Sequence, residues 1–438
     1  MAVENVPGHD IRYHLVAFDA QGRERPEDGG LHSRAVLHAA AQTTPTDVFV
    51  FSHGWMGDIP AARTQYGRWL AAMASCTADR VAAHELPGGF RPLLLGLHWP
   101  SQAWGDEELG AASFDALVGG SAGEPVVDGY APRLADTPAT RRALQTIVRA
   151  ALRDVAPTTL PPEVRQAYEV IDAEAGAGAT GAGAAPGDDR DPFDPEATYQ
   201  ACQVEDLVSF GGPVLGGILA PLRVLTFWHM KRRARLFGER GAADLLSELQ
   251  RATPSAYFHV MGHSFGCIVA AAAIAGPAEP PAQRPAVRSL TLAQGAMSLW
   301  SFCSSIPAQP QRSGYFRRVV ADGLVNGTIL ITTSVHDRAV RTFYPLGAAA
   351  RSQVDYRPGD LPTYGGIGAF GARGPGIDIV DADLLAETES YELSPRVVYN
   401  LRADEFIATG GGVMGAHSDI AQPAVAHALW QAVTAGRR

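Results

Sequence analysis

The sequence predicts an α/β fold: a mostly parallel central sheet with helices on both faces and a large inserted region. Several short runs are apolar throughout instead of alternating, which is typical of strands that are buried on both faces. Segments of helical composition separate these runs, as in repeated strand–helix–strand units. With 438 residues, of which 46% are hydrophobic and 19% charged, the chain is long and apolar enough to bury a large core.

The expected strands follow one another along the chain. The first is "IRYHLVAFDA" at 11–20, and the second is "TDVFVFSHGW" at 46–55, which is bounded by Pro45 and Gly54. "RPLLLGLHWP" at 91–100 and "SAYFHVMG" at 255–262 have the same continuous apolar character. Further strands are expected at 287–295, 327–335 and 396–403, and helices at 33–42, 61–75, 138–155, 162–174 and 420–433.

The connection between the strands at 91–100 and 255–262 is far longer than one helix requires. A structureless loop of that length is not expected inside a compact domain. We therefore expect residues 1–100 and 240–438 to form the core, and residues 101–239 to form an inserted lid or cap. Within it, "AGAGATGAGAAPGDD" at 175–189 predicts a flexible tract. A second, glycine-rich insertion is expected at about 338–395, as loops over the same face.

An apolar stretch at 207–230 precedes the basic sequence "KRRAR". By length it could span a bilayer. Pro213, Pro221, Arg223 and four glycines within it favour a buried or substrate-lining lid helix instead. A segment that dips into a membrane surface stays open, so peripheral membrane contact through 207–235 is a possible partner interaction.

Composition restricts the remaining partners. A formal net charge of −10 argues against nucleic acid as a partner, because an acidic chain repels phosphate backbones.

The N-terminal residues lack a basic region followed by an apolar one, so a cytoplasmic location is expected. Cys76, Cys202, Cys267 and Cys303 are widely spaced and predict buried free thiols. His259 and His263 have no neighbouring carboxylate, so a zinc site is not expected. The serine chemistry that the motif at 262–266 indicates requires no metal or organic cofactor.

The strongest motif is "GHSFG" at 262–266, between an apolar strand and the alanine-rich segment "CIVAAAAIA". Ser264 is therefore expected at a sharp strand-to-helix turn. Gly262 and Gly266, which flank His263 and the serine, lack a Cβ and let the backbone double back. The hydroxyl would stand at the sheet edge beside a helix N-terminus, which indicates a nucleophile more than a turn serine.

With this motif the sequence resembles the α/β-hydrolase superfamily, in particular its serine esterase and lipase branch. The resemblance covers the core strands but not the large insertions. It implies a catalytic acid after a strand downstream of the serine, and Asp337 in "ITTSVHDRAV" fills that position better than Asp322 or Asp404. It also implies a histidine after the last strand, and His417 in "GGGVMGAHSDI" fills it.

The resemblance further implies an oxyanion hole made by two backbone amides. One belongs to the residue after the nucleophile, Phe265. The other belongs to the loop after the strand at 46–55, where "FSHGWMGD" contains a His-Gly pair. Trp55 is the expected second donor, with Gly54 or Met56 as alternatives. Trp99, Trp104 and Trp228 are expected either to line an acyl pocket under the lid or to be ordinary packing residues.

These residues together predict a serine hydrolase of the carboxylesterase or lipase type. His417 would take the proton of Ser264, and Asp337 would orient the imidazole. The expected substrate is a small-molecule ester or lipid-like ester with an apolar acyl group. Thioesterase, amidase or peptidase activity would use the same three residues, and a non-catalytic binding protein on the same fold is the alternative from another class.

Overall fold

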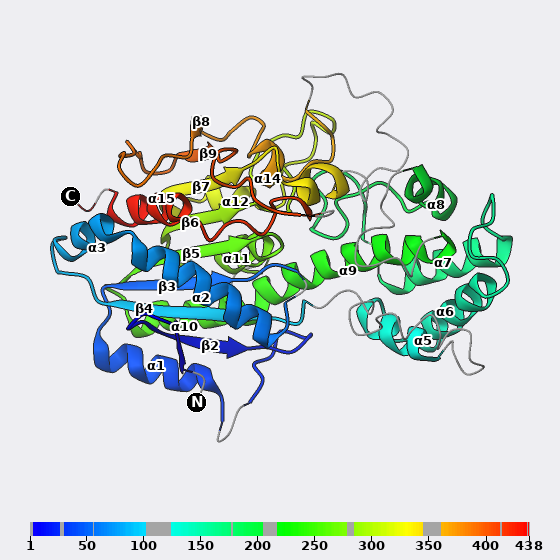
Figure 1. Cartoon of the computed structure of the whole chain (residues 1–438), viewed down its shortest axis with the longest axis horizontal. Helices are drawn as coiled ribbons and strands as arrows, with labels where there is room; N and C mark the ends of the chain where they lie inside the picture. The colour runs from blue at the N-terminus through cyan, green and yellow to red at the C-terminus, as the bar shows by residue number, and fades with distance from the viewer. Residues whose placement is uncertain are drawn as a thin grey trace.

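The structure is a computed structural model, and it describes residues 3–26, 30–55, 57–101, 124–176, 178–204, 217–277, 284–344, 361–411, 414–435 and 437. In this part of the chain, nine strands form one sheet in the order β1-β2-β4-β3-β5-β6-β7-β9-β8 (Figure 1). The edge strand β1 is antiparallel to β2, and all other neighbours are parallel. The strands are β1 (Val3–Asn5), β2 (Arg12–Ala17), β3 (Asp47–Ser52), β4 (Pro92–His98), β5 (Tyr257–His263), β6 (Val287–Ala293), β7 (Val325–Thr333), β8 (Ile379–Asp383) and β9 (Val398–Arg402).

Helices cover both faces of the sheet, which confirms the predicted α/β class (Figure 1). One face packs against α2 (Ile59–Ser75), α3 (Thr77–His84) and α15 (Pro423–Thr434). The other packs against α1 (His32–Thr43), α10 (Ala243–Ala252), α11 (Gly266–Ala275) and α12 (Arg317–Ala321). In β3, Val48 and Val50 point into the second layer while Phe49 and Phe51 point into the first. This is why the strand is apolar without alternation.

All seven strands expected from the sequence are present, with ends that differ by a few residues. The short edge strands β1 and β8 were not expected. The sequence of β8, "IVDAD", contains two aspartates and is largely exposed, so it lacks the apolar run of a buried strand. The insertion at 338–395 is therefore not made of loops alone, because it contains β8, the short helix α14 (Ile367–Phe370) and a π-helical turn, η5 (Ala339–Phe343).

The region inserted between β4 and β5 has a hydrophobic core of its own. Its helices are α5 (Glu124–Tyr130), α6 (Pro138–Ala151), α7 (Pro162–Glu174) and α8 (Pro195–Val204), with short 3₁₀ helices η1 (Ala131–Arg133) and η3 (Gly217–Leu219). They project beyond the carboxyl ends of the parallel strands (Figure 1). The long helix α9 (Ala220–Phe237) and a π-helical turn, η4 (Gly238–Ala242), return the chain to the sheet, where both contact α11.

The glycine- and alanine-rich tract at 175–189 differs from the flexible segment that its composition predicts. Apart from residue 177, the structure describes it as a series of turns packed on α9. Asp188 pairs with Arg232, and Asp189 pairs with the fully buried Lys231 at 2.5 Å. Lys231, the only lysine of the chain, also donates a hydrogen bond to the hydroxyl of Tyr344. These buried ion pairs order a stretch whose small residues contribute little packing of their own.

Helix α9 contains the second half of the apolar stretch at 207–230, whereas residues 207–216 lie outside the described residues. The helix is largely buried, and Pro221 lies in its first turn. None of the described helices combines the length and the hydropathy that a membrane span requires. The buried side chains of α9 make it an internal element of the part of the chain that the structure describes.

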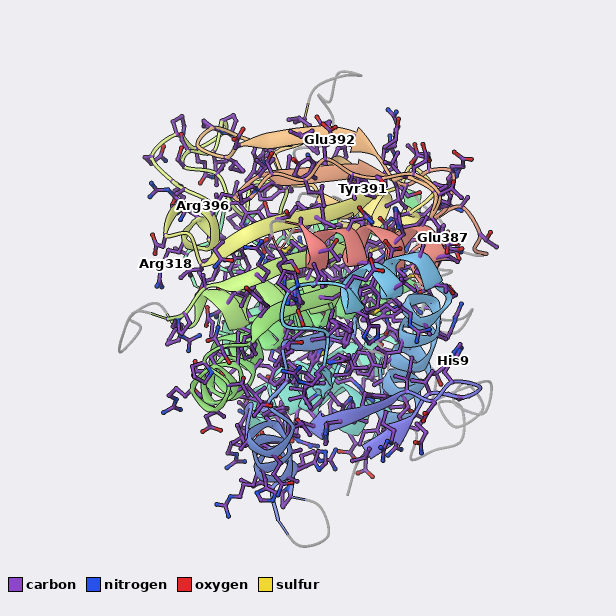
Figure 2. All side chains as sticks on the ribbon, turned by 90° about the vertical axis from the view of Figure 1, so that its left-hand side faces the viewer. His9, Arg318, Glu387, Tyr391, Glu392 and Arg396 are labelled. Atoms are coloured by element: carbon purple, nitrogen blue, oxygen red, sulfur yellow. The ribbon has the colours of Figure 1, made fainter. Side chains whose placement is uncertain are left out.

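The end of the molecule opposite the inserted helices carries the loop between β8 and β9 (Figure 2). Glu387, Tyr391, Glu392 and Arg396 lie on this loop.

The four cysteines are free and buried, as their spacing predicts. Burial raises the pKa of the Cys76 and Cys202 thiols to about 12, so neither is a reactive thiolate near neutral pH.

Candidate functional site

The site lies where the strand connections diverge. Strands β3 and β5 are neighbours, but β3 leads through α2 towards β4 and β5 leads through α11 towards β6. The two helices pack on opposite faces of the sheet. At such a switch point the carboxyl ends of the two strands border a crevice, which is where ligands bind in open α/β sheets. The loop after β3 and the turn after β5 meet there.

Ser264 occupies the turn between β5 and α11 with φ of +55°, in the left-handed region that a residue with a Cβ rarely adopts. Its amide donates to the carbonyl of Ala293 at 3.1 Å. Its own carbonyl accepts from the amides of Cys267 at 3.1 Å and Ala296 at 3.2 Å. The end of β6 thus holds the serine in a strained conformation, which is a feature of functional sites.

Three glycines let the backbone segments approach one another around this serine. A Cβ on Gly262 would lie 2.2 Å from the carbonyl oxygen of Gly266, and a Cβ on Gly266 would lie 2.3 Å from that of Ser52. A Cβ on Gly54 would lie 2.8 Å from the Cβ of Ser264. The positive φ belongs to the serine and not to Gly262 or Gly266, so these two glycines are required for close approach.

The structure brings His417 and Asp337 together, although 80 residues separate them. Asp337 follows β7 and is completely buried, and His417 lies in the loop between β9 and α15. His417 Nδ1 is 2.8 Å from Asp337 Oδ2. Because a carboxylate only accepts, Nδ1 donates this hydrogen bond, and Nε2 is the nitrogen that can accept a proton from a hydroxyl. The two loops are also joined by a backbone bridge between Asp337 and Gly415.

Two further groups hold the Asp337 carboxylate in place. The amide of Val340 donates to Oδ1 at 2.9 Å, and Gln294 Nε2 donates to Oδ2 at 3.1 Å. Gln294 follows β6, is fully buried and has φ of +45°, and its side-chain oxygen accepts from Thr332. The charge is therefore stabilised by hydrogen bonds at both oxygens. Gln294 was not expected from the sequence, because a lone glutamine after a strand belongs to no motif.

His263 lies between the serine turn and the loop of His417. Its Nε2 is 2.9 Å from the backbone oxygen of His417, and its Nδ1 is 2.9 Å from Nε2 of Gln65 on α2. The rings of His263 and His417 are 4.8 Å apart. Burial, followed by the proximity of His417, lowers the pKa of His263 to about 3. His263 is therefore a neutral ring with both nitrogens in hydrogen bonds.

Ser264 and His417 line one cavity of about 490 Å³. The same cavity is bounded by residues of α8 and α9 from the inserted region, including Cys202, Val224 and Phe227. Most of its lining surface is apolar. It combines a hydroxyl, an imidazole and a hydrophobic wall, which is the composition of a pocket for an apolar ligand with one reactive group.

Trp55 and Phe265, the two residues expected to provide oxyanion amides, both line the cavity together with Ser264. The Trp55 ring packs on Phe265 and Phe227, with centroids 5.5 and 5.6 Å apart. No acceptor for the Phe265 amide is found among the described residues. Of the two alternatives to Trp55, Gly54 touches Ser264 and Met56 lies outside the described residues.

The tryptophans expected in an acyl pocket are placed differently. Trp99 is completely buried behind the site, where its indole nitrogen donates to the carbonyl of His53 at 3.2 Å. Trp228 packs against Tyr344 and Lys231 and does not reach the cavity. Trp104 lies outside the described residues. The tryptophans that do line the cavity are Trp55 and Trp69.

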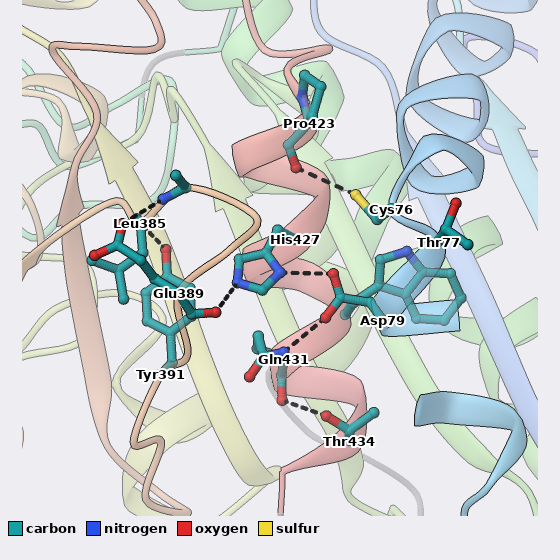
Figure 3. Close-up of polar contacts among 12 residues, drawn as sticks. Cys76, Thr77, Asp79, Leu385, Glu389, Tyr391, Pro423, His427, Gln431 and Thr434 are labelled. Carbon is teal, nitrogen blue, oxygen red and sulfur yellow. Dashed lines mark hydrogen bonds and ion pairs between the residues drawn. The ribbon is translucent and has the colours of Figure 1, made fainter. Parts of the chain in front are cut away.

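The other histidine–carboxylate contacts are structural. His427 is a buried residue of α15. Its Nδ1 lies 2.7 Å from Asp79 Oδ2, and its Nε2 donates to the carbonyl of Glu389 (Figure 3). Cys76 in the same view donates to the carbonyl of Pro423 instead of to the histidine. This network joins α3, α15 and the loop after β8, and none of its residues lines the cavity.

A second serine–histidine–aspartate set lies inside the sheet. His259 contacts Ser289 Oγ at 2.8 Å and Asp47 Oδ1 at 3.2 Å, and Arg437 pairs with the same aspartate at 2.6 Å. Ser289, His259 and Asp47 are buried and do not border the cavity of Ser264. Burial lowers the pKa of His259.

Within the described residues, no group of three or more His, Cys, Asp or Glu side chains is arranged to hold a metal ion. No family model, curated protein or solved structure compared with the chain matches it. A strained serine and a histidine–aspartate pair around one cavity can transfer a proton from a hydroxyl and stabilise the resulting imidazolium.

Proposed function

We propose that the protein is a serine hydrolase with an α/β-hydrolase fold, and that it cleaves carboxylic esters with apolar acyl groups. The observation that supports this most directly is the shared cavity of Ser264 and His417, with His417 Nδ1 hydrogen-bonded to Asp337 at 2.8 Å. The strained strand-to-helix turn and the chain order serine, acid, histidine agree with that fold.

In the proposed reaction, His417 Nε2 takes the proton of Ser264 as Oγ attacks the ester carbonyl. Asp337 keeps the imidazole in the required tautomer and stabilises its positive charge. The amides of Phe265 and Trp55 stabilise the oxyanion, and removing such a donor typically costs about 3 kcal/mol of transition-state stabilisation. The alcohol then leaves with the proton from His417, and water hydrolyses the acyl-enzyme.

The cavity supports an ester with an apolar acyl group over a small polar one. Trp55, Trp69, Val224, Phe227, Phe265 and Met414 contribute apolar side chains to its wall. Helices α8 and α9 contribute to the wall of this cavity, so the inserted region would determine the length of acyl chain that fits. This assigns to the inserted region the role of a lid.

The test is labelling with a fluorophosphonate probe, together with turnover of 4-nitrophenyl esters from acetyl to palmitoyl. Wild type should label and turn over esters, and Ser264→Ala should do neither. Ser418→Ala is the matched control, because Ser418 lines the same cavity but belongs to no hydrogen-bonded set with Asp337. A folded wild type that neither labels nor hydrolyses any ester would reject the proposal, as would labelling that persists in Ser264→Ala.

A further inference from the structure

His263 connects the two residues that react in the proposed mechanism. It is the last residue of β5 and directly precedes Ser264 in the chain. Its Nε2 lies 2.9 Å from the backbone oxygen of His417. Because a carbonyl oxygen can only accept, Nε2 carries the proton and donates it. One side chain thus ties the backbone of the base to the residue next to the nucleophile.

Gln65 stabilises the tautomer that this contact requires. In a neutral ring protonated at Nε2, Nδ1 must accept, and Gln65 Nε2 is in place to donate to it at 2.9 Å. Burial lowers the pKa of His263 to about 3, so the ring stays neutral near physiological pH. Gln65 belongs to α2, the helix that follows the loop of Gly54. The ring cannot turn without losing both hydrogen bonds, one of which, to the His417 carbonyl, is buried.

The loop that carries His417 has a different attachment on its other side. The amide of Ala416 donates to the carbonyl of His336 at 2.9 Å, and Gly415 pairs with Asp337. These contacts fix the loop to the segment of the acid. The hydrogen bond from His263 fixes it to the segment of the serine, and so sets the separation of the two reacting groups.

We infer that His263 is a positioning residue for the proposed hydrolysis, and that Gln65 keeps it in the tautomer that holds His417 beside Ser264. The inference rests on the proposed function. His263 is not itself the base, because both of its nitrogens are already in hydrogen bonds and its ring is buried. Loss of the His263 side chain should lower the rate of the chemical step, because displacing a reacting group by about 1 Å lowers that rate about 10²-fold.

The experiment compares His263→Leu, which removes the donor, with His263→Gln, whose side-chain amide can replace it. Kinetics with the preferred 4-nitrophenyl ester give kcat and KM, and thermal unfolding checks the fold. We expect His263→Leu to lower kcat by about 10²-fold with KM little changed, and His263→Gln to restore about a tenfold part of that loss. Wild-type kcat in His263→Leu, or equal kcat in the two folded variants, would overturn the inference.

A second pair of variants keeps the test decisive if His263→Leu fails to fold. Gln65→Leu removes only the donor to Nδ1. Gln65→Glu places a carboxylate beside Nδ1, which favours a second proton on the ring and keeps Nε2 as the donor to the His417 carbonyl. We expect a lower kcat for Gln65→Leu than for Gln65→Glu, and equal values would contradict the inference. Wild type without labelling or turnover would remove the proposed function itself, which separates the two failures.

Discussion

Replacing Ser264 by glycine should make the protein more stable than replacing it by alanine, although both changes remove the hydroxyl. The φ of +55° costs a residue with a Cβ about 1–2 kcal/mol relative to a right-handed conformation. Alanine keeps that Cβ and therefore the strain, whereas glycine releases it. Glycine also makes the unfolded chain more flexible, which costs about 0.5–1 kcal/mol. The expected net advantage of Ser264→Gly over Ser264→Ala is about 1 kcal/mol.

The assay is urea unfolding of the two variants, followed by circular dichroism, with activity measured in parallel. The midpoint of Ser264→Gly should lie above that of Ser264→Ala, and a thermal scan should show a shift of roughly 1–2 °C in a chain of this length. Ser418, which has no positive φ, provides the control pair, because glycine there should be no more stable than alanine. If Ser264→Gly is the less stable variant, the turn does not store the strain that its backbone angle indicates.

Other perturbations test the surroundings of the serine. Gly54→Ala should abolish fluorophosphonate labelling because its Cβ would lie 2.8 Å from that of Ser264, whereas Gly411→Ala, which has no atom within 4 Å of the added group, should label normally. Gln294→Leu should lower kcat by roughly 10-fold or more in ester kinetics, since a hydrogen bond to a charged group contributes about 1.5–3 kcal/mol and Asp337 would lose one; an unchanged kcat would argue against that role. Stability measured by urea unfolding should fall from pH 7 to pH 5, because burial lowers the pKa of His53 and His263 from 6.5 to about 3. The unfolded chain then takes up protons that the folded chain does not, so stability is complete above pH 6.5 and decreases towards pH 3. Each ring should account for about 2 kcal/mol of the loss between pH 7 and pH 5, and a flat profile would mean that these rings are not held neutral.

The strands and the turn at Ser264 could be predicted because their sequence signals are local. A continuous apolar run such as β3 needs two covered faces, and glycines on both sides of a serine permit a tight turn. Asp337 and His417 could be proposed only from the chain order of serine, acid and histidine in the superfamily that the sequence resembles. That their side chains meet at 2.8 Å depends on how β7 and β9 lie next to each other, which no local pattern contains.

The supporting residues could not be predicted for the same reason. Gln294 makes a hydrogen bond to Asp337, and Gln65 makes one to His263. The two glutamines come from different elements, and neither belongs to a sequence motif that would mark it as part of the site. The tract at 175–189 was expected to be flexible because glycine and alanine bury little surface. Its order depends on Arg232 and Lys231, which lie more than forty residues away and supply partners for its two terminal aspartates.

The single lysine of the chain has a practical consequence. Lys231 is buried at the junction of α9, the 175–189 tract and Tyr344, where burial lowers its pKa to about 8. An amine-selective reagent would therefore meet no lysine on the surface of the described structure, and Lys231 would react only when this junction opens. The rate of side-chain acylation would then measure how often this junction opens. The protein thus contains its own chemical reporter of that motion, without any engineered label.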